Sequence, residues 1–75
     1  MNVMYKRIFD AEFARIKKEL EAQFNDPNHN GARILLSSSY RPYATRFMMR
    51  ISELYPINTI DYDNVIGSIN ITFNK

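Results

Sequence analysis

The residues best suited to chemistry lie in one stretch, SSSYRPYATRFMMR, at positions 37 to 50. It contains three serines, two tyrosines, one proline and three arginines, and no acidic residue. Hydroxyl and guanidinium groups can hold a phosphate, and a helix N-terminus adds unpaired amides that carry about half a positive charge. The stretch therefore predicts either a phosphate-binding surface or the start of an ordinary helix.

Part of this stretch is explained by helix formation. Pro42 is preorganised for a first helical turn, so we predict a helix over residues 42–55 that ends before Pro56. Its predicted inner face consists of Tyr43, Phe47, Ile51 and Leu54, widened by Ala44, Met48 and Tyr55. Arg41 and Arg46 then lie near the helix N-terminus, where a cation is unfavourable by about 0.3 to 1 kcal/mol. A bound phosphate would reverse the sign of that interaction.

Three interpretations of the outer face of this helix stay open. The candidate partner-binding residues are Arg33, Tyr40, Arg41, Arg46, Met49 and Arg50. A nucleic acid would use the arginines for phosphate and the tyrosine ring for a base. A protein partner is favoured by Met49, an apolar residue among charges, because Met and Arg are enriched at interfaces. The third interpretation is a solvated basic face with no partner.

The first helix carries a similar apolar outlier. Met4 and Ile8, with Ala11, fall roughly opposite Phe13 and away from the main apolar stripe. Misplaced apolar residues among charges are typical of interaction surfaces, although isolated exposed apolar residues are also common. We therefore expect these residues to be exposed.

The remaining residues form no recognisable catalytic, phosphate-binding or metal-binding motif. The chain has no cysteine, and its one histidine, His29, lies in the turn-rich segment NDPNHNG without a second ligand nearby. The two glycines are too far apart for a phosphate-binding loop. Asp61 and Asp63 are more typical of a solvated turn than of a metal site. We expect a non-enzymatic protein with no cofactor and no metal.

The elements that position these residues follow from the apolar pattern. Residues 5–24 place Tyr5, Phe9, Phe13, Ile16, Leu20 and Phe24 on one stripe, which predicts a long amphipathic helix. The apolar run ARILLSS predicts a buried strand over residues 32–38. The last twenty residues predict a hairpin in which Asp63 and Asn64 form a two-residue turn and Tyr62 pairs with Val65. The strand that begins near Ile57 could slip by two residues.

These elements predict an α+β fold in the order α-β-α-β-β. A right-handed crossover through the second helix would set the first strand parallel to the second. We therefore expect a two-layer α/β sandwich, with a three-stranded mixed sheet and both helices on one face. The predicted buried face of the hairpin comprises Ile60, Tyr62, Val65, Ile69, Ile71 and Phe73, and the wet face comprises Ser68, Asn70 and Thr72.

Length and composition favour one compact domain over residues 1–75. The sequence is 45% hydrophobic with five tyrosines and five phenylalanines, which argues against disorder. In so small a chain, a homodimer is a further source of buried area. Charged residues interrupt the N-terminal sequence before a signal peptide could form, and no apolar run is long enough to span a membrane. We expect a cytoplasmic protein with no membrane partner.

In composition the chain resembles the small early proteins of T-even-like bacteriophages. The resemblance is carried by eight asparagines, the absence of cysteine and tryptophan, the NDPNHNG loop and the ending NVIGSINITFNK. It implies a viral host-takeover role, in which a compact protein binds and redirects a component of the host cytoplasm. It assigns no functional residue. The expected partner is accordingly a host protein, with nucleic acid as the alternative.

Overall fold

The computed structural model describes residues 3–74, with side chains described from Lys6 to Asn74. Its elements are α1 (Val3–Phe24), β1 (Gly31–Leu35), a 3₁₀ turn η1 (Arg41–Tyr43), α2 (Ala44–Leu54), β2 (Ile57–Asp63) and β3 (Ser68–Phe73). The predicted order α-β-α-β-β and the α+β class are confirmed. Pro42 lies in η1 rather than in α2, so the predicted second helix is a 3₁₀ turn that continues into an α-helix.

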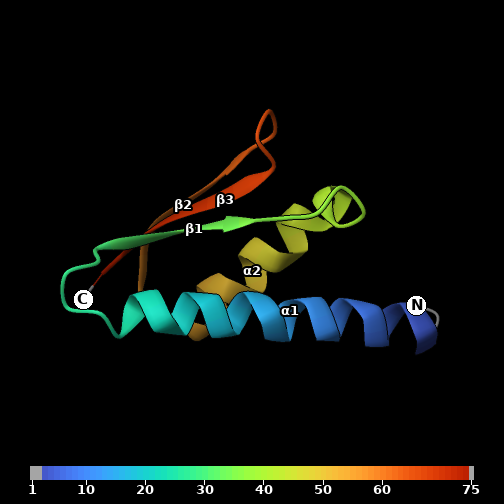
Figure 1. Cartoon of the computed structure of the whole chain (residues 1–75), viewed down its shortest axis with the longest axis horizontal. Helices are drawn as coiled ribbons and strands as arrows, with labels where there is room; N and C mark the ends of the chain where they lie inside the picture. The colour runs from blue at the N-terminus through green and yellow to red at the C-terminus, as the bar shows by residue number, and fades with distance from the viewer. Residues whose placement is uncertain (1–2, 75) are drawn as a thin grey trace.

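The sheet is antiparallel rather than mixed. Its strand order is β1-β3-β2, and β3 pairs antiparallel with both neighbours (Figure 1). The strands β1 and β2 do run in the same direction, as the crossover argument predicts. They are separated by β3, however, so no two paired strands in the described chain are parallel. The hairpin returns β3 to the centre, where Ile69, Ile71 and Phe73 are buried.

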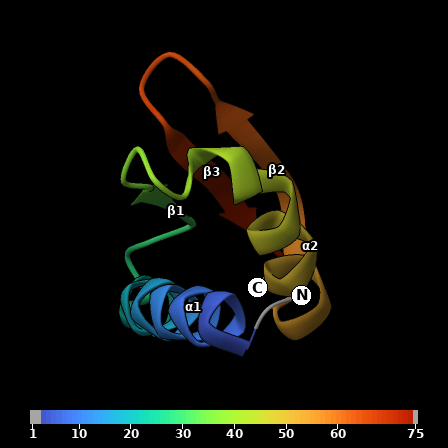
Figure 2. The ribbon, with the colours of Figure 1, turned by 90° about the vertical axis from the view of Figure 1, so that its right-hand side faces the viewer.

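Both helices lie on one face of the sheet (Figure 1). Viewed along α1, α2 lies to one side of it (Figure 2). One core joins the helices to the strands, and its members are Phe9, Phe13, Ile16, Leu20, Ala32, Ile34, Leu36, Ala44, Phe47, Ile51, Ile69, Ile71 and Phe73. The predicted two-layer arrangement is therefore confirmed.

The helix interiors match the predicted stripes with one exception. In α1 the stripe is buried from Phe9 to Leu20 and half-buried at Phe24, whereas the Tyr5 side chain lies outside the described residues. In α2, Leu54 was expected on the inner face but is 54% exposed. It is the last helical residue, and Tyr55 after it is already extended (φ −132°, ψ 150°). The buried face of α2 therefore ends at Ile51, one turn before the helix does.

The hairpin register differs from the predicted one. Tyr62 pairs with Ile69, four residues beyond the predicted Val65. A two-residue turn of the favoured type needs positive φ at both central residues, but among the described residues only Gly67 has positive φ (79°). The loop therefore extends over residues 64–67. Because the shift is even, Ile69 stays on the buried face, while Val65 moves into the loop and is 84% exposed.

The sheet face opposite the helices is polar, but not all of its side chains are exposed to solvent. Thr72 is exposed, as expected, but Asn70 is half-buried and Ser68 is fully buried. Ser68 is paired between Leu35 and Asp63 of the neighbouring strands. Its hydroxyl donates a hydrogen bond to Asn70 Oδ1 at 3.3 Å. The side chain is therefore covered without losing its hydrogen bond.

Candidate functional site

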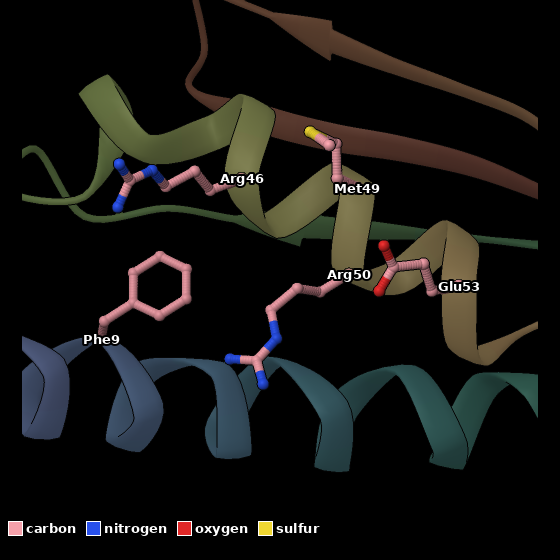
Figure 3. A pocket seen from close by; sticks show the side chains of 5 residues that line it. All are labelled: Phe9, Arg46, Met49, Arg50 and Glu53. Carbon is pink, nitrogen blue, oxygen red and sulfur yellow. The ribbon is translucent and has the colours of Figure 1, made fainter.

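An open hollow of about 240 Å³ lies where α2 crosses α1, and we call it the α1–α2 hollow. Its lining consists of Phe9, Arg46, Met49, Arg50 and Glu53. Figure 3 shows Phe9 rising from α1 toward α2, and Arg50 reaching from α2 toward α1. Arg46 lies at one end of the hollow and Glu53 at the other, with Met49 between them and its side chain directed away from α1. Three of the six predicted binding residues therefore meet here.

Helical spacing explains why these residues share one surface. Arg46, Met49, Arg50 and Glu53 stand at positions i, i+3, i+4 and i+7, so they form one stripe along α2. The opposite side of the helix carries Phe47 and Ile51, which are fully buried. The stripe must therefore face away from the sheet. Met49, at its centre, is 60% exposed.

Arg50 forms one wall of the hollow and joins the two helices. Its Nη1 lies 3.3 Å from Asp10 Oδ1 in an ion pair with α1. Its guanidinium carbon lies 4.8 Å from the centre of the Phe13 ring and 5.9 Å from that of Phe9, both within cation–π range. The charge of Arg50 is therefore already partly satisfied within the chain.

Phe9, the aromatic residue of the lining, packs on the core. The rings of Phe9 and Phe47 are stacked, with centroids 4.4 Å apart and an interplanar angle of 3°. Tyr40 was a candidate for stacking on a base, but its half-buried ring packs edge-on against Phe47, with centroids 6.2 Å apart. Tyr40 therefore packs at the edge of the core and does not line the hollow.

Arg41 and Arg33 lie elsewhere. Arg41 Nη2 donates a hydrogen bond to the Ile66 carbonyl oxygen at 3.0 Å, so its guanidinium reaches the β2–β3 loop. Arg33 lies on the polar face of the sheet, where its Nε donates to Asn70 Oδ1 at 3.2 Å. The structure therefore places the four arginines on three different surfaces.

The apolar outliers of α1 belong to another surface as well. Ile8 is 49% exposed and Ala11 is exposed, while the Met4 side chain lies outside the described residues. Ile8 stands seven residues before Arg15, whose Nη2 donates to the Leu35 carbonyl oxygen of β1 at 3.1 Å. This flank of α1 faces β1, whereas Asp10 lies on the flank that faces α2. Ile8 therefore does not line the hollow.

Two lining residues escaped prediction. Phe9 belongs to the apolar stripe of α1 and is 7% exposed, so the sequence pattern assigned it to the core alone. Glu53 was not among the predicted binding residues. The signal that could have identified Glu53 was its spacing of two helical turns from Arg46.

A second polar contact joins the helices at their C-terminal ends. The Tyr55 hydroxyl donates a hydrogen bond to Glu21 Oε1 at 2.9 Å. Burial, together with this hydrogen bond to a carboxylate, raises the pKa of Tyr55 to about 12. The contact keeps α2 close to α1 beyond the hollow, because Tyr55 directly follows the last residue of α2.

Asp63, at the end of β2, has a structural role in the hairpin. The Asp63 carboxylate accepts hydrogen bonds from the amides of Val65 and Ile66 at 2.9 and 3.2 Å, which confirms it as a turn former. No cluster of three or more His, Cys, Asp or Glu side chains in the described part of the chain is placed to hold a metal ion. Within residues 3–74, no helix has both the length and the apolar character needed to cross a membrane.

Comparisons with protein-family models, curated proteins and solved structures find no match for this chain. The function is therefore argued from the α1–α2 hollow itself. Its geometry suits an apolar side chain, which would contact Phe9 and Met49. Arg46 and Glu53 would meet polar groups at the two ends.

Proposed function

We propose that this protein is a non-enzymatic binding protein that acts by occupying the surface of another protein through the α1–α2 hollow. The observation that carries the proposal is Met49, which is 60% exposed at the centre of a charged stripe and lines the same hollow as Phe9. Apolar centres with polar rims are the usual arrangement of protein interfaces, and Met and Arg are enriched there.

The charges define the partner segment that fits. Arg50 is paired with Asp10, so Arg46 is the arginine of the hollow that is free to meet a carboxylate. An apolar side chain of the partner would pack on Met49, and an acidic residue beside it would face Arg46. A base at the other end of the segment would face Glu53. The compositional resemblance to phage early proteins supports a bacterial host protein as the source of this segment.

The test is affinity capture from bacterial lysate with three forms of the protein. Met49→Asp places a charge at the centre of the contact and should abolish capture of a partner that the unaltered protein retains. Ile8→Asp is the matched control, because Ile8 is similarly exposed (49%) but lies on the flank of α1 that faces β1. The Ile8→Asp variant should capture the partner as well as the unaltered protein does.

A captured protein is then purified and titrated against each form by calorimetry. Burying the new carboxylate of Met49→Asp should weaken binding at least tenfold, which corresponds to about 1.4 kcal/mol. Equal affinity for the unaltered protein and Met49→Asp, or equal loss with Ile8→Asp, would show that the hollow is not the contact.

Nucleic-acid binding stays a hypothesis with less geometric support. Arg33 and Arg41 are engaged on other surfaces, and Arg50 is paired with Asp10. A titration with DNA and RNA at two salt concentrations tests it, because phosphate contacts weaken steeply as salt rises. Unchanged affinity in Arg41→Ala combined with Arg46→Ala would exclude the predicted residues as the nucleic-acid site.

A further inference from the structure

The outer stripe of α2 is complementary to itself. Arg46 and Glu53 stand seven residues apart, and the midpoint between them falls between Met49 and Arg50. If a second α2 lay antiparallel across this midpoint, each Arg46 would face the Glu53 of the other copy. A two-fold dimer uses one patch twice, so a stripe with opposite charges at equal distances from its centre meets the requirement for such a dimer.

We propose that a second copy of this chain covers the α1–α2 hollow, with the two α2 helices antiparallel about a two-fold axis near Met49. Two Arg46–Glu53 ion pairs would flank a centre made of both Met49 side chains. This inference goes beyond the proposed function, because the dimer would close the face that a different protein needs. The two events would therefore compete.

The charged groups of the stripe are available for this role. Arg46 and Glu53 lie about 10 Å apart along the helix axis, too far to pair with each other. Neither forms an ion pair within the part of the chain that the structure describes. Arg50 is held by Asp10 at 3.3 Å, so bringing two copies of Arg50 near the axis would not juxtapose two uncompensated cations.

The centre of the stripe supplies the apolar contact. Met49 is 60% exposed, and a methionine side chain adapts its shape to fill the space between two helices. The other exposed large apolar residues of the described chain are Ile8, Leu35, Leu54, Val65 and Ile66, and of these only Leu54 lies on α2, at its last residue.

The size of the contact predicts a reversible dimer. The helix α2 has 11 residues and is therefore about 16 Å long. A pair of such helices buries less area than the roughly 1,200 Å² at the lower end of stable interfaces. We therefore expect a dimer that forms at high protein concentration and dissociates on dilution.

Sedimentation equilibrium over a wide range of protein concentration tests the proposal. Arg46→Glu and Glu53→Arg each replace two attractive pairs with two repulsive ones, so each should raise the dissociation constant about tenfold or more. The combined variant Arg46→Glu with Glu53→Arg places opposite charges face to face again and should restore dimerisation. Ile8→Asp should dimerise as the unaltered protein does.

Three results would overturn the proposal. The first is an unaltered protein that stays monomeric at every concentration. The second is a dimer that both single charge reversals leave intact, which would place the interface elsewhere. The third is a combined variant that stays as monomeric as the single variants although its circular dichroism shows a native fold. None of these affects the capture test, which is run at concentrations where the chain is monomeric, so the two proposals fail separately.

Discussion

Arg50 joins the two helices through two different kinds of contact. It forms an ion pair with Asp10, and its guanidinium lies over the rings of Phe9 and Phe13. Exposed ion pairs and exposed cation–π contacts each contribute up to about 1 kcal/mol. The side chain is nearly half exposed, so solvent screens both contributions. Arg50 thus contributes to stability and shapes the hollow at the same time.

We predict that Arg50→Ala lowers the free energy of unfolding by about 1 kcal/mol, because it removes both contacts. Asp10→Ala removes the ion pair alone and should lower it by less. Urea denaturation of both single variants and the double variant measures the coupling between the two residues. A double variant whose loss equals the sum of the single losses would show that the ion pair contributes nothing.

Asp63 and Asp61 differ in role although they are two residues apart on one strand. The Asp63 carboxylate accepts the amides of Val65 and Ile66, and Asp61 is exposed. We predict that Asp63→Ala lowers the free energy of unfolding by about 1 kcal/mol, as the loss of a helix cap does. Asp61→Ala is the matched control and should have little effect. Equal losses in the two variants, measured by urea denaturation, would contradict this role for Asp63.

At the scale of elements, the β2–β3 loop depends on one glycine. Gly67 has φ 79°, and a Cβ at this position would overlap with the guanidinium of Arg41. The left-handed conformation costs another residue about 1 to 2 kcal/mol, while a flexible arginine head can move aside. We therefore expect the positive φ at residue 67 to cost more stability than the overlap with Arg41 does.

Gly67→Ala should accordingly lower the free energy of unfolding by about 1 to 2 kcal/mol. In an Arg41→Ala background the loss should be only slightly smaller, because only the overlap is relieved. Thermal or urea unfolding of the four proteins separates the two terms. A loss that disappears entirely in the Arg41→Ala background would show that crowding, and not φ, makes glycine necessary.

The helices and strands could be predicted from the sequence because the regularly spaced apolar residues are the ones that the fold buries. The stripe of α1 from Phe9 to Leu20 is one example, since every stripe residue in that range is buried. The hairpin register could not be predicted, because alternation is preserved by any even shift. Only the conformation of Gly67 distinguishes a two-residue turn from the longer loop. The hollow was missed in part because Phe9 is both a core residue and a lining residue.

For the whole molecule, two polar contacts add to the aromatic packing of Phe9 and Phe13 on Phe47 that joins the helices. Arg50 contacts Asp10 near the hollow, and Tyr55 contacts Glu21 beyond the C-terminal end of α2. The four arginines could not be assigned to one surface from their spacing alone. Their side chains diverge because β1, η1 and α2 present them in different directions. The position of α2 against α1 defines the hollow, so contacts between the helices also affect binding.

The Tyr55 contact predicts how stability depends on alkaline pH. The pKa of Tyr55 is raised from 10.0 in the free side chain to about 12 in the folded protein, so the folded state favours the neutral hydroxyl. Above pH 10 the unfolded chain loses this proton first, which favours unfolding. The stabilisation by Tyr55 is therefore fully present below pH 10 and is lost as the pH rises toward 12.

Tyr55→Phe isolates this effect, because it removes the ionisable hydroxyl and keeps the ring beside Phe24. At neutral pH the variant should be less stable than the unaltered protein, since it lacks the hydrogen bond to Glu21. The difference should shrink as the pH rises from 10 to 12, because the unfolded chain then gains from ionisation of Tyr55 in the unaltered protein only. Urea denaturation at a series of pH values measures it. A difference that stays constant over this range would mean that the hydroxyl does not resist ionisation, and that the two helices are not joined through a neutral Tyr55.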